Sequence, residues 1–321
     1  MSRNHTLDQL RGLAALMVSV HHLSLALPDV LQTLVYSWQT GVQMFFVISG
    51  YIIPYSMAKS GYRTADIGRF WLKRLLRLQP SYTVALLFTF AISCAAAVAK
   101  GASPEATWWH LLQGLFYFWV PAENPVIWTL IVEMKYYLFI SIFFPLLFSP
   151  HRALCIGAFC VCGAAAAFGA ERLEVLRHLP FFLFGFVACN LALSRITARE
   201  SILLMLLAAA AALPRSTYPE LAAGLICYLA IRYLPPLTFR AGMFLGTISY
   251  SLYLIHFPLG VKLVNLMLPH TPPAWRFLWT PVGTTVCVLA AYVVYRLVEK
   301  PSSKWSQRIR LSGAPLSPAA T

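Results

Sequence analysis

The most constraining feature of the sequence is a series of ten mainly apolar stretches. Most of them are close in length to the about 20 residues that a helix needs to cross a bilayer. Hydrophobic residues make up 59% of the chain and charged residues only 11%, which is too apolar a balance for a soluble protein. The sequence therefore predicts an all-α fold, a polytopic transmembrane bundle of about ten helices. The expected spans are 7–27, 34–58, 81–99, 125–148, 152–170, 176–193, 201–214, 218–234, 243–268 and 275–298.

The connections between these spans are too short to form a separate domain. We expect residues 1–305 to form one transmembrane domain, and the polar, proline-containing residues 306–321 to form a disordered cytoplasmic tail. No small-residue cleavage site follows the first span, so we expect a retained helix rather than a removable signal peptide.

The net charge of +14 raises the question of nucleic-acid binding, so the position of the basic residues matters. When the N-terminus is placed in the cytoplasm, most of the 25 lysines and arginines fall in cytoplasmic segments. The outer segments hold only Lys100, Arg172, Arg177, Arg215 and Arg276. This asymmetry is the positive-inside pattern of a membrane protein. We expect both termini in the cytoplasm, the lipid bilayer as a partner and no nucleic-acid partner.

The seven cysteines lie in apolar stretches and do not form pairs in loops, so we expect no disulfide framework. Cys155, Cys160 and Cys162 lack the spacing and the histidine partners of a zinc site. No metal is expected.

Charged and polar residues inside the first span are the first candidates for chemistry, because such groups are costly at membrane depth. The spacing between Arg11 and His22 places both side chains within about 20° of the same face of a helix, with a rise of about 16 Å between them. Asp8 lies one turn before Arg11 and can pair with it. The alternatives are an arginine that reaches the interface and a histidine bonded to a neighbouring helix. His21 points about 100° away from His22 and is interpreted as a packing residue.

A carboxylate, Glu133, lies inside the fourth span, where it needs a partner, a proton or an aqueous cavity. Lys135, two positions later, falls on the opposite face and is not the obvious partner. A purely structural buried glutamate is the alternative.

Two further groups of residues are candidates. Arg74 and Arg77 share a helix face before the third span and could bind anionic lipid headgroups or the phosphates of a cofactor. Tyr253 and His256 can be neighbours in the ninth span, where Pro258 is expected to kink the helix. A structural hydrogen-bonded pair and a functional site are both compatible with that spacing.

Six segments of the chain, in this order, resemble the acyltransferase-3 family of membrane acyltransferases. They are LDQLRGLAALMVSVHH, FFVISGY, KRLLRLQP, WTLIVE, SYSLYLIHFPL and VEKP, and together they cover nearly the whole chain.

The resemblance implies an O-acyltransferase that uses acetyl-CoA from the cytoplasm as its donor. The family's basic residue and histidine fall on Arg11 and His22, its Arg-x-x-Arg element on Arg74 and Arg77, and its glutamate on Glu133. His22 would be the general base or a transient acyl-histidine nucleophile, and Glu133 would assist it or position the acceptor. The three arginines would hold and guide the coenzyme A, with Asp8, Tyr253 and His256 in support.

Two departures from the family pattern concern hydroxyl groups and charge. Thr129 and Ile131 stand where the family commonly has serines, and Lys73 stands where arginine is common. The sequence ends shortly after the tenth expected span, so we expect it to carry no fused periplasmic domain of the kind that some relatives have.

The compact length resembles that of bacterial exopolysaccharide O-acetyltransferases. This similarity implies a multi-pass protein of the cell inner (cytoplasmic) membrane, a polysaccharide or lipid-linked oligosaccharide as acceptor, and polysaccharide assembly machinery as a partner. The alternatives are transfer of succinyl or another acyl group, and a transporter or flippase for lipid-linked sugars.

Overall fold

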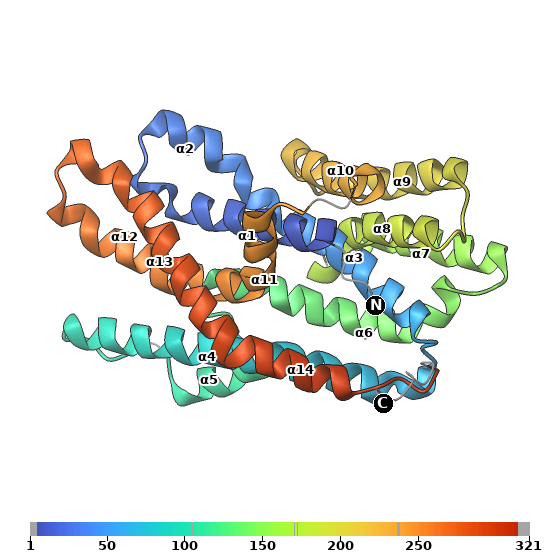
Figure 1. The fold of residues 1–321 in the computed structure, drawn as a ribbon, viewed down its shortest axis with the longest axis horizontal. Coiled ribbons are helices and arrows are strands. Elements are labelled where there is room, and N and C mark those ends of the chain that lie inside the picture. The colour runs from blue at the N-terminus through green and yellow to red at the C-terminus, as the bar shows by residue number, and fades with distance from the viewer. Residues whose placement is uncertain (1–4, 105, 170, 172, 236–237, 314–321) are drawn as a thin grey trace. The chain divides into compact units, whose positions relative to one another are not determined.

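The protein is mainly helical in the residues that the computed structural model describes, which are 5–104, 106–169, 171, 173–235 and 238–313. No strand occurs in these ranges, so the prediction of an all-α fold is confirmed (Figure 1). Arg172 and residues 314–321 of the expected tail lie outside the described ranges. The main helices are α1 (His5–Leu23), α2 (Asp29–Tyr36), α3 (Gly41–Lys59), α4 (Ile67–Ala99), α5 (Trp108–Leu115), α6 (Trp128–Leu147), α7 (Arg152–Gly169), α8 (Glu174–Ala192), α9 (Ala198–Ala212), α10 (Tyr218–Tyr233), α11 (Arg240–Ile255), α12 (Lys262–Met267), α13 (Trp279–Val294) and α14 (Lys300–Arg308).

Seven helical stretches in the described residues are long and apolar enough to cross a membrane, and each overlaps one expected span. The three remaining expected spans, 7–27, 201–214 and 218–234, coincide with α1, α9 and α10. Of these, α9 has 15 residues and α10 has 16, while α1 carries Asp8 and Arg11. The chain is a multi-pass membrane protein. The seven stretches are Asp29–Lys59, Thr64–Ala99, Pro125–Leu147, Arg152–Gly169, Glu174–Ala192, Arg240–His270 and Pro273–Arg308.

The chain divides into two compact units, and α3, α4 and α6 each contribute residues to both. Unit 1 consists of Met1–Val42, Leu76–Ile131 and Pro236–Lys304. Unit 2 consists of Gln43–Leu75, Val132–Pro235 and Trp305–Thr321.

Within unit 1, glycines allow α1 to pack directly against the backbone of α11, and this is the most extensive contact of α1. A Cβ atom on Gly12 would lie 2.5 Å from the backbone nitrogen of Gly246, so a larger side chain does not fit there. Small residues of this kind let transmembrane helices approach closely. His22 follows Gly12 at the same distance along the sequence as His256 follows Gly246, so the two helices run parallel and bring these histidines to the same depth.

The helix that follows α11 is π-helical from His256 to Val261 and contains Pro258. Proline lacks the N–H group of a regular helical bond, and π segments commonly mark functional sites in helices. The expected disturbance of the helix at Pro258 is therefore present as a change from α to π geometry.

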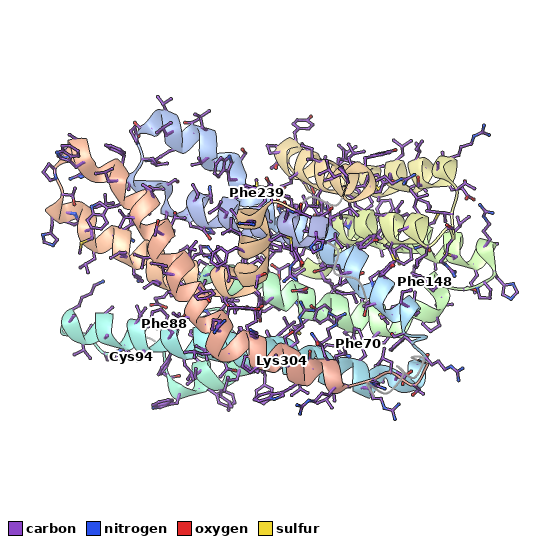
Figure 2. All side chains as sticks on the ribbon, viewed as in Figure 1. Phe70, Phe88, Cys94, Phe148, Phe239 and Lys304 are labelled. Carbon is purple, nitrogen blue, oxygen red and sulfur yellow. The ribbon has the colours of Figure 1, made fainter. Side chains whose placement is uncertain are left out.

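Within unit 2, α8 forms the core and packs against α7, α9 and α10. Its residues 178–190 are all buried. Gly185 of α8 faces α3, because a Cβ there would lie 2.6 Å from the backbone nitrogen of Tyr51. The exposed face of α9 is apolar, with Leu203 61% and Leu206 62% exposed, which suits contact with lipid. Phe88 on α4, labelled in Figure 2, is another exposed apolar side chain.

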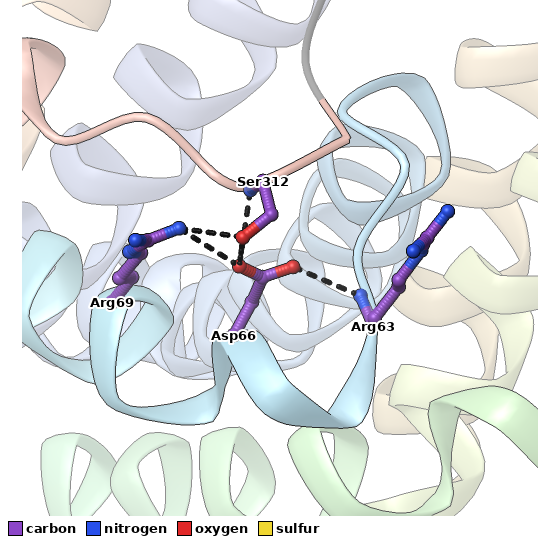
Figure 3. A network of polar contacts seen from close by, with 4 residues as sticks. All are labelled: Arg63, Asp66, Arg69 and Ser312. Carbon is purple, nitrogen blue, oxygen red and sulfur yellow. Dashed lines mark hydrogen bonds and ion pairs between the residues drawn. The ribbon is translucent and has the colours of Figure 1, made fainter.

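The start of α4 in unit 2 is held by a buried carboxylate (Figure 3). Asp66, only 1% exposed, accepts hydrogen bonds from the hydroxyl of Ser312 at 2.5 Å, from its backbone N–H at 3.0 Å and from the N–H of Arg63 at 3.2 Å. Arg69 pairs with the same carboxylate at 3.5 Å. These bonds hold Ser312, which follows α14, beside the start of α4 within unit 2.

Candidate active site

A pair of histidines lies at the end of α1 in unit 1. His22 Nδ1 is 2.9 Å from His256 Nε2, and the two rings stack with centroids 5.2 Å apart. His256 is completely buried, whereas His22 is partly exposed. His22 is thus bonded to a residue from another helical segment, and that residue is itself a histidine.

Backbone carbonyls fix which nitrogen of each ring carries the proton. His256 Nδ1 lies 2.8 Å from the carbonyl oxygen of Tyr253 and 3.2 Å from that of Leu252. Because carbonyls only accept hydrogen bonds, Nδ1 of a neutral His256 carries the proton and its Nε2 is an acceptor. His22 Nδ1 must then be the donor. In its neutral form His22 consequently has an unprotonated Nε2, the state required of a general base or nucleophile.

The end of α1 is fixed by apolar packing next to this pair. Leu23 is fully buried and clusters with Ala26, Val261 and Val264. The hydroxyl of Thr280 on α13 donates to the carbonyl oxygen of Leu23 at 2.9 Å. These contacts limit the freedom of the neighbouring His22 backbone.

A carboxylate near Ser251 of α11, before His256 along the chain direction of that helix, interacts with two arginines. Ser251 donates to Glu299 at 2.6 Å, and Glu299 interacts electrostatically with Arg11 and Arg77. Ser251 precedes His256 by about 8 Å of helix rise. Arg11 and Arg77, two residues predicted to guide the coenzyme, thus both lie within electrostatic range of one acidic group in unit 1.

Tyr253 and a buried asparagine complete the polar groups around the end of α11. The hydroxyls of Tyr253 and Thr129 are 2.9 Å apart, so the threonine that replaces a family serine still takes part in a hydrogen bond. Asn124, fully buried, donates to the carbonyl oxygen of Leu254 at 3.0 Å. Its Oδ1 has no hydrogen-bond partner among the described residues. This oxygen is a buried acceptor with capacity for one further donor.

Glu133 belongs to unit 2, where two hydroxyls bind it. Ser49 of α3 donates to Glu133 Oε1 at 2.8 Å, and Tyr137, one turn further along α6, donates to the same oxygen at 2.7 Å. Lys135 pairs instead with Glu174 at 3.8 Å, which agrees with its expected position on the opposite face. The requirement of Glu133 for a partner is therefore met by hydroxyl groups.

Arg74 lies near the Glu133 group in unit 2. Its guanidinium is 5.5 Å from the ring centroids of both Phe70 and Tyr137, in cation–π geometry. Tyr137 therefore contacts Arg74 through its ring and Glu133 through its hydroxyl. Arg74 and Arg77 lie one turn apart on α4, as expected, but belong to different units.

Sequence reasoning left out four residues of these groups. Ser49 and Glu299 occur within the segments FFVISGY and VEKP. The sequence of a single helix does not show the partner of either residue, so it assigns no role to them. Tyr137 could have been found as the residue one turn after Glu133. Asn124 offers only a weak signal, a polar residue just before a proline at a helix start. Asp8, expected in support, lies one turn before Arg11 on α1.

No group of three or more histidine, cysteine, aspartate or glutamate side chains that could hold a metal ion occurs in the described part of the chain.

Comparisons with known proteins identify the family to which the chain is similar. A family described as an acyltransferase domain matches residues 4–296. The chain is 30% identical over 166 residues to the O-acetyltransferase OatA of Staphylococcus aureus, covering 46% of this chain and 25% of that protein. It is 23% identical over 360 residues to the peptidoglycan O-acetyltransferase OatA of Listeria monocytogenes, covering 93% of this chain and 56% of that protein. The chain thus spans between a quarter and about half of the length of these relatives. No solved structure matches it.

Proposed function

The chain belongs to the acyltransferase-3 family, and from this premise we propose that it is an O-acetyltransferase of the bacterial inner membrane. It would move an acetyl group from cytosolic acetyl-CoA to a sugar hydroxyl of an exopolysaccharide or of its lipid-linked precursor. The observation that carries the proposal is the histidine pair, in which His256 leaves Nε2 of His22 unprotonated.

His22 is the reactive group in either of two routes. As a general base, Nε2 takes the proton of the sugar hydroxyl while the sugar oxygen bonds to the thioester carbonyl carbon. The C–S bond then breaks, and the leaving thiolate takes the proton from the imidazolium. As a nucleophile, Nε2 itself bonds to the carbonyl carbon, and the C–S bond breaks to release the thiolate of coenzyme A. The sugar oxygen then bonds to the acetyl carbon as the N–C bond breaks, and the proton of the sugar hydroxyl passes to the thiolate. In both routes His256 supports the positive charge on His22 by accepting its Nδ1 hydrogen bond.

The basic residues would bind the donor. Arg11 and Arg77 around Glu299 provide cationic groups at a different depth from His22, along the face predicted for the entry of coenzyme A. Arg74 would add a contact to a phosphate, with its guanidinium oriented by Phe70 and Tyr137. Glu133, held by Ser49 and Tyr137, would position the acceptor.

The class of acceptor rests on the chain's resemblance to exopolysaccharide acetyltransferases. The name of the Listeria relative assigns peptidoglycan to that protein, so peptidoglycan is the second acceptor to test. Succinyl transfer is the corresponding alternative for the donor. Membership of an acyltransferase family favours an enzyme over the alternative of a sugar flippase.

The test is mass spectrometry of the surface polysaccharide and peptidoglycan from a deletion strain that carries either wild type or His22→Ala. We expect wild type to restore an acetyl mass that His22→Ala does not restore, with glycan export unchanged in both. Loss of glycan export in the deletion strain, with acetylation of the remaining glycan intact, would replace the enzyme by the flippase. An added succinyl mass would identify the donor alternative.

A further inference from the structure

A cavity of about 260 Å³ lies in unit 2, lined by α7, α8, α9 and the segments that follow α6 and α8, and none of the residues assigned to chemistry lines it. Its volume is several times the roughly 30 Å³ that a water molecule occupies in the liquid. Its apolar lining includes Phe159, Phe186 and Leu204. Its polar lining includes Ser149, Asn190 and Arg195.

Arg195 is one of the polar residues that line the cavity, and its guanidinium is held in a fixed orientation. Its Nε donates to Asn190 Oδ1 at 3.2 Å, and its Nη2 donates to the carbonyl oxygen of Ser149 at 2.8 Å. It also lies 4.9 Å from the ring centroid of Phe148, the residue directly after α6. Its Nη1 has no hydrogen-bond partner in the part of the chain that the structure describes. A cation with a remaining donor thus stands at the cavity.

The turn after α8 explains why Arg195 points back to the cavity. Ser194 has a φ of 54°, in the left-handed region, and the N–H of Arg195 bonds the carbonyl oxygen of Asn190 at 2.9 Å. Asn190 is only 2% exposed, and its Nδ2 donates to the carbonyl oxygen of Phe186 at 3.0 Å. The chain therefore uses a buried asparagine and a strained turn to position this arginine.

The second arginine at the cavity, Arg152, is already paired. It forms an ion pair with Glu200 of α9, whose carboxylate also caps that helix through the N–H of Thr197 at 2.8 Å. The net positive charge at the cavity is consequently that of Arg195. One fixed cation beside the apolar side chains of the cavity lining fits a ligand with one anionic group and a hydrocarbon part.

We propose that this cavity binds the phosphate of an anionic phospholipid, with the adjoining part of an acyl chain against Phe159, Phe186 and Leu204. Basic pockets between transmembrane helices favour anionic headgroups. A guanidinium recognises phosphate oxygens through paired N–H donors. The lipid would join α7, α8 and α9 and stabilise unit 2 independently of catalysis.

Binding of phosphatidylglycerol to the purified protein, measured by native mass spectrometry and by thermal unfolding, tests the proposal. Phosphatidylcholine and inorganic phosphate are the comparison ligands. We expect phosphatidylglycerol to bind wild type and raise its midpoint of unfolding, and neither comparison ligand to match it. Equal effects of phosphatidylcholine would show that charge is irrelevant and overturn the proposal. Equal effects of inorganic phosphate would identify a site for free phosphate instead of lipid.

Two variants and one control separate the site from general lipid contact. Arg195→Gln removes the cation. Leu204→Phe fills space beside the apolar lining residues of the cavity while the arginine remains. We expect each to weaken phosphatidylglycerol binding about 10-fold or more, which corresponds to ~1.4 kcal/mol. Arg199→Gln, on the exposed surface of α9 and outside the cavity lining, should bind like wild type. Wild-type binding by Leu204→Phe and Arg195→Gln would contradict the assignment, even if one of them unfolds more easily.

Discussion

His22 and His256 are 234 positions apart in the sequence, and their ring nitrogens are 2.9 Å apart in the structure. The contact is directional, because the far nitrogen of His256 is committed to the carbonyl oxygens of Leu252 and Tyr253. The orientation of His22 is therefore set by the backbone of α11 through one intervening ring. This arrangement leads to the first prediction.

Replacing His256 should lower the rate of acetyl transfer through His22. His256→Leu removes the acceptor of the Nδ1 proton, and loss of such a positioning partner typically costs ~10- to 100-fold in activity. His256→Gln, whose amide oxygen can accept the same bond, should retain more activity.

The measurement is kcat and KM for acetyl-CoA together with the pH dependence of kcat. We expect kcat and its pH profile to change in His256→Leu while KM stays within a small factor. If His256→Leu and His256→Gln lose activity equally and keep the wild-type pH profile, His256 has only a packing role.

The close approach of α1 to α11 should be essential for the histidine pair. Gly246→Leu would place a side chain against the backbone of Asp8, so the helices must separate or the protein must misfold. We expect loss of activity and a lower thermal stability. Gly157→Leu on α7 is the matched control, because nothing lies within 4 Å of its Cβ position. Comparable losses in both variants would mean that leucine in any such helix is harmful.

Arg11 and Arg77 should contribute to the binding of the donor. Their replacement by glutamine removes positive charge near Glu299, so KM for acetyl-CoA should rise about 10-fold, or ~1.4 kcal/mol, for each. Arg69→Gln is the control, since Arg69 is exposed and pairs with Asp66. An unchanged KM in Arg11→Gln and Arg77→Gln would remove both residues from the donor site.

The hydroxyl groups around Glu133 should stabilise unit 2. Tyr137→Phe deletes one donor to a carboxylate, an interaction worth ~1.5–3 kcal/mol. The loss should shrink in a Glu133→Gln background, because the two residues share the bond. Lys135→Gln should cost less than about 1 kcal/mol, since its ion pair with Glu174 is half-exposed. Thermal unfolding in detergent measures all four variants. Equal costs of Tyr137→Phe in both backgrounds would show that the bond is not stabilising.

Sequence reasoning predicted relations along single helices better than relations between helices. The periodicity of α1 correctly placed Arg11 and His22 on one face, and the hydropathy pattern anticipated the seven long helices. The pairing of His22 with His256 depends on the register of α1 against α11, which Gly12 and Gly246 determine. That register is invisible in either segment alone.

The same limit applies to the acidic residues. Glu133 was expected to need a partner, but Ser49 lies on another helix and its distance depends on how α3 packs against α6. Glu299 was read only as part of a short segment after the last span. Its meeting with Ser251 of α11 required the three-dimensional arrangement of unit 1.

Acetyl transfer by the purified protein in lipid vesicles tests the central role of His22 most directly. Labelled acetyl-CoA and the host glycan would be supplied to wild type, His22→Ala and His21→Ala. His21→Ala is the matched control, because His21 is adjacent but faces the carbonyl oxygen of Val35 at 3.3 Å. We predict that His21→Ala transfers acetyl groups and that His22→Ala, folded to the same extent, loses at least ~100-fold of the rate. Equal transfer by His22→Ala and wild type would contradict the assignment of His22 as the reactive residue.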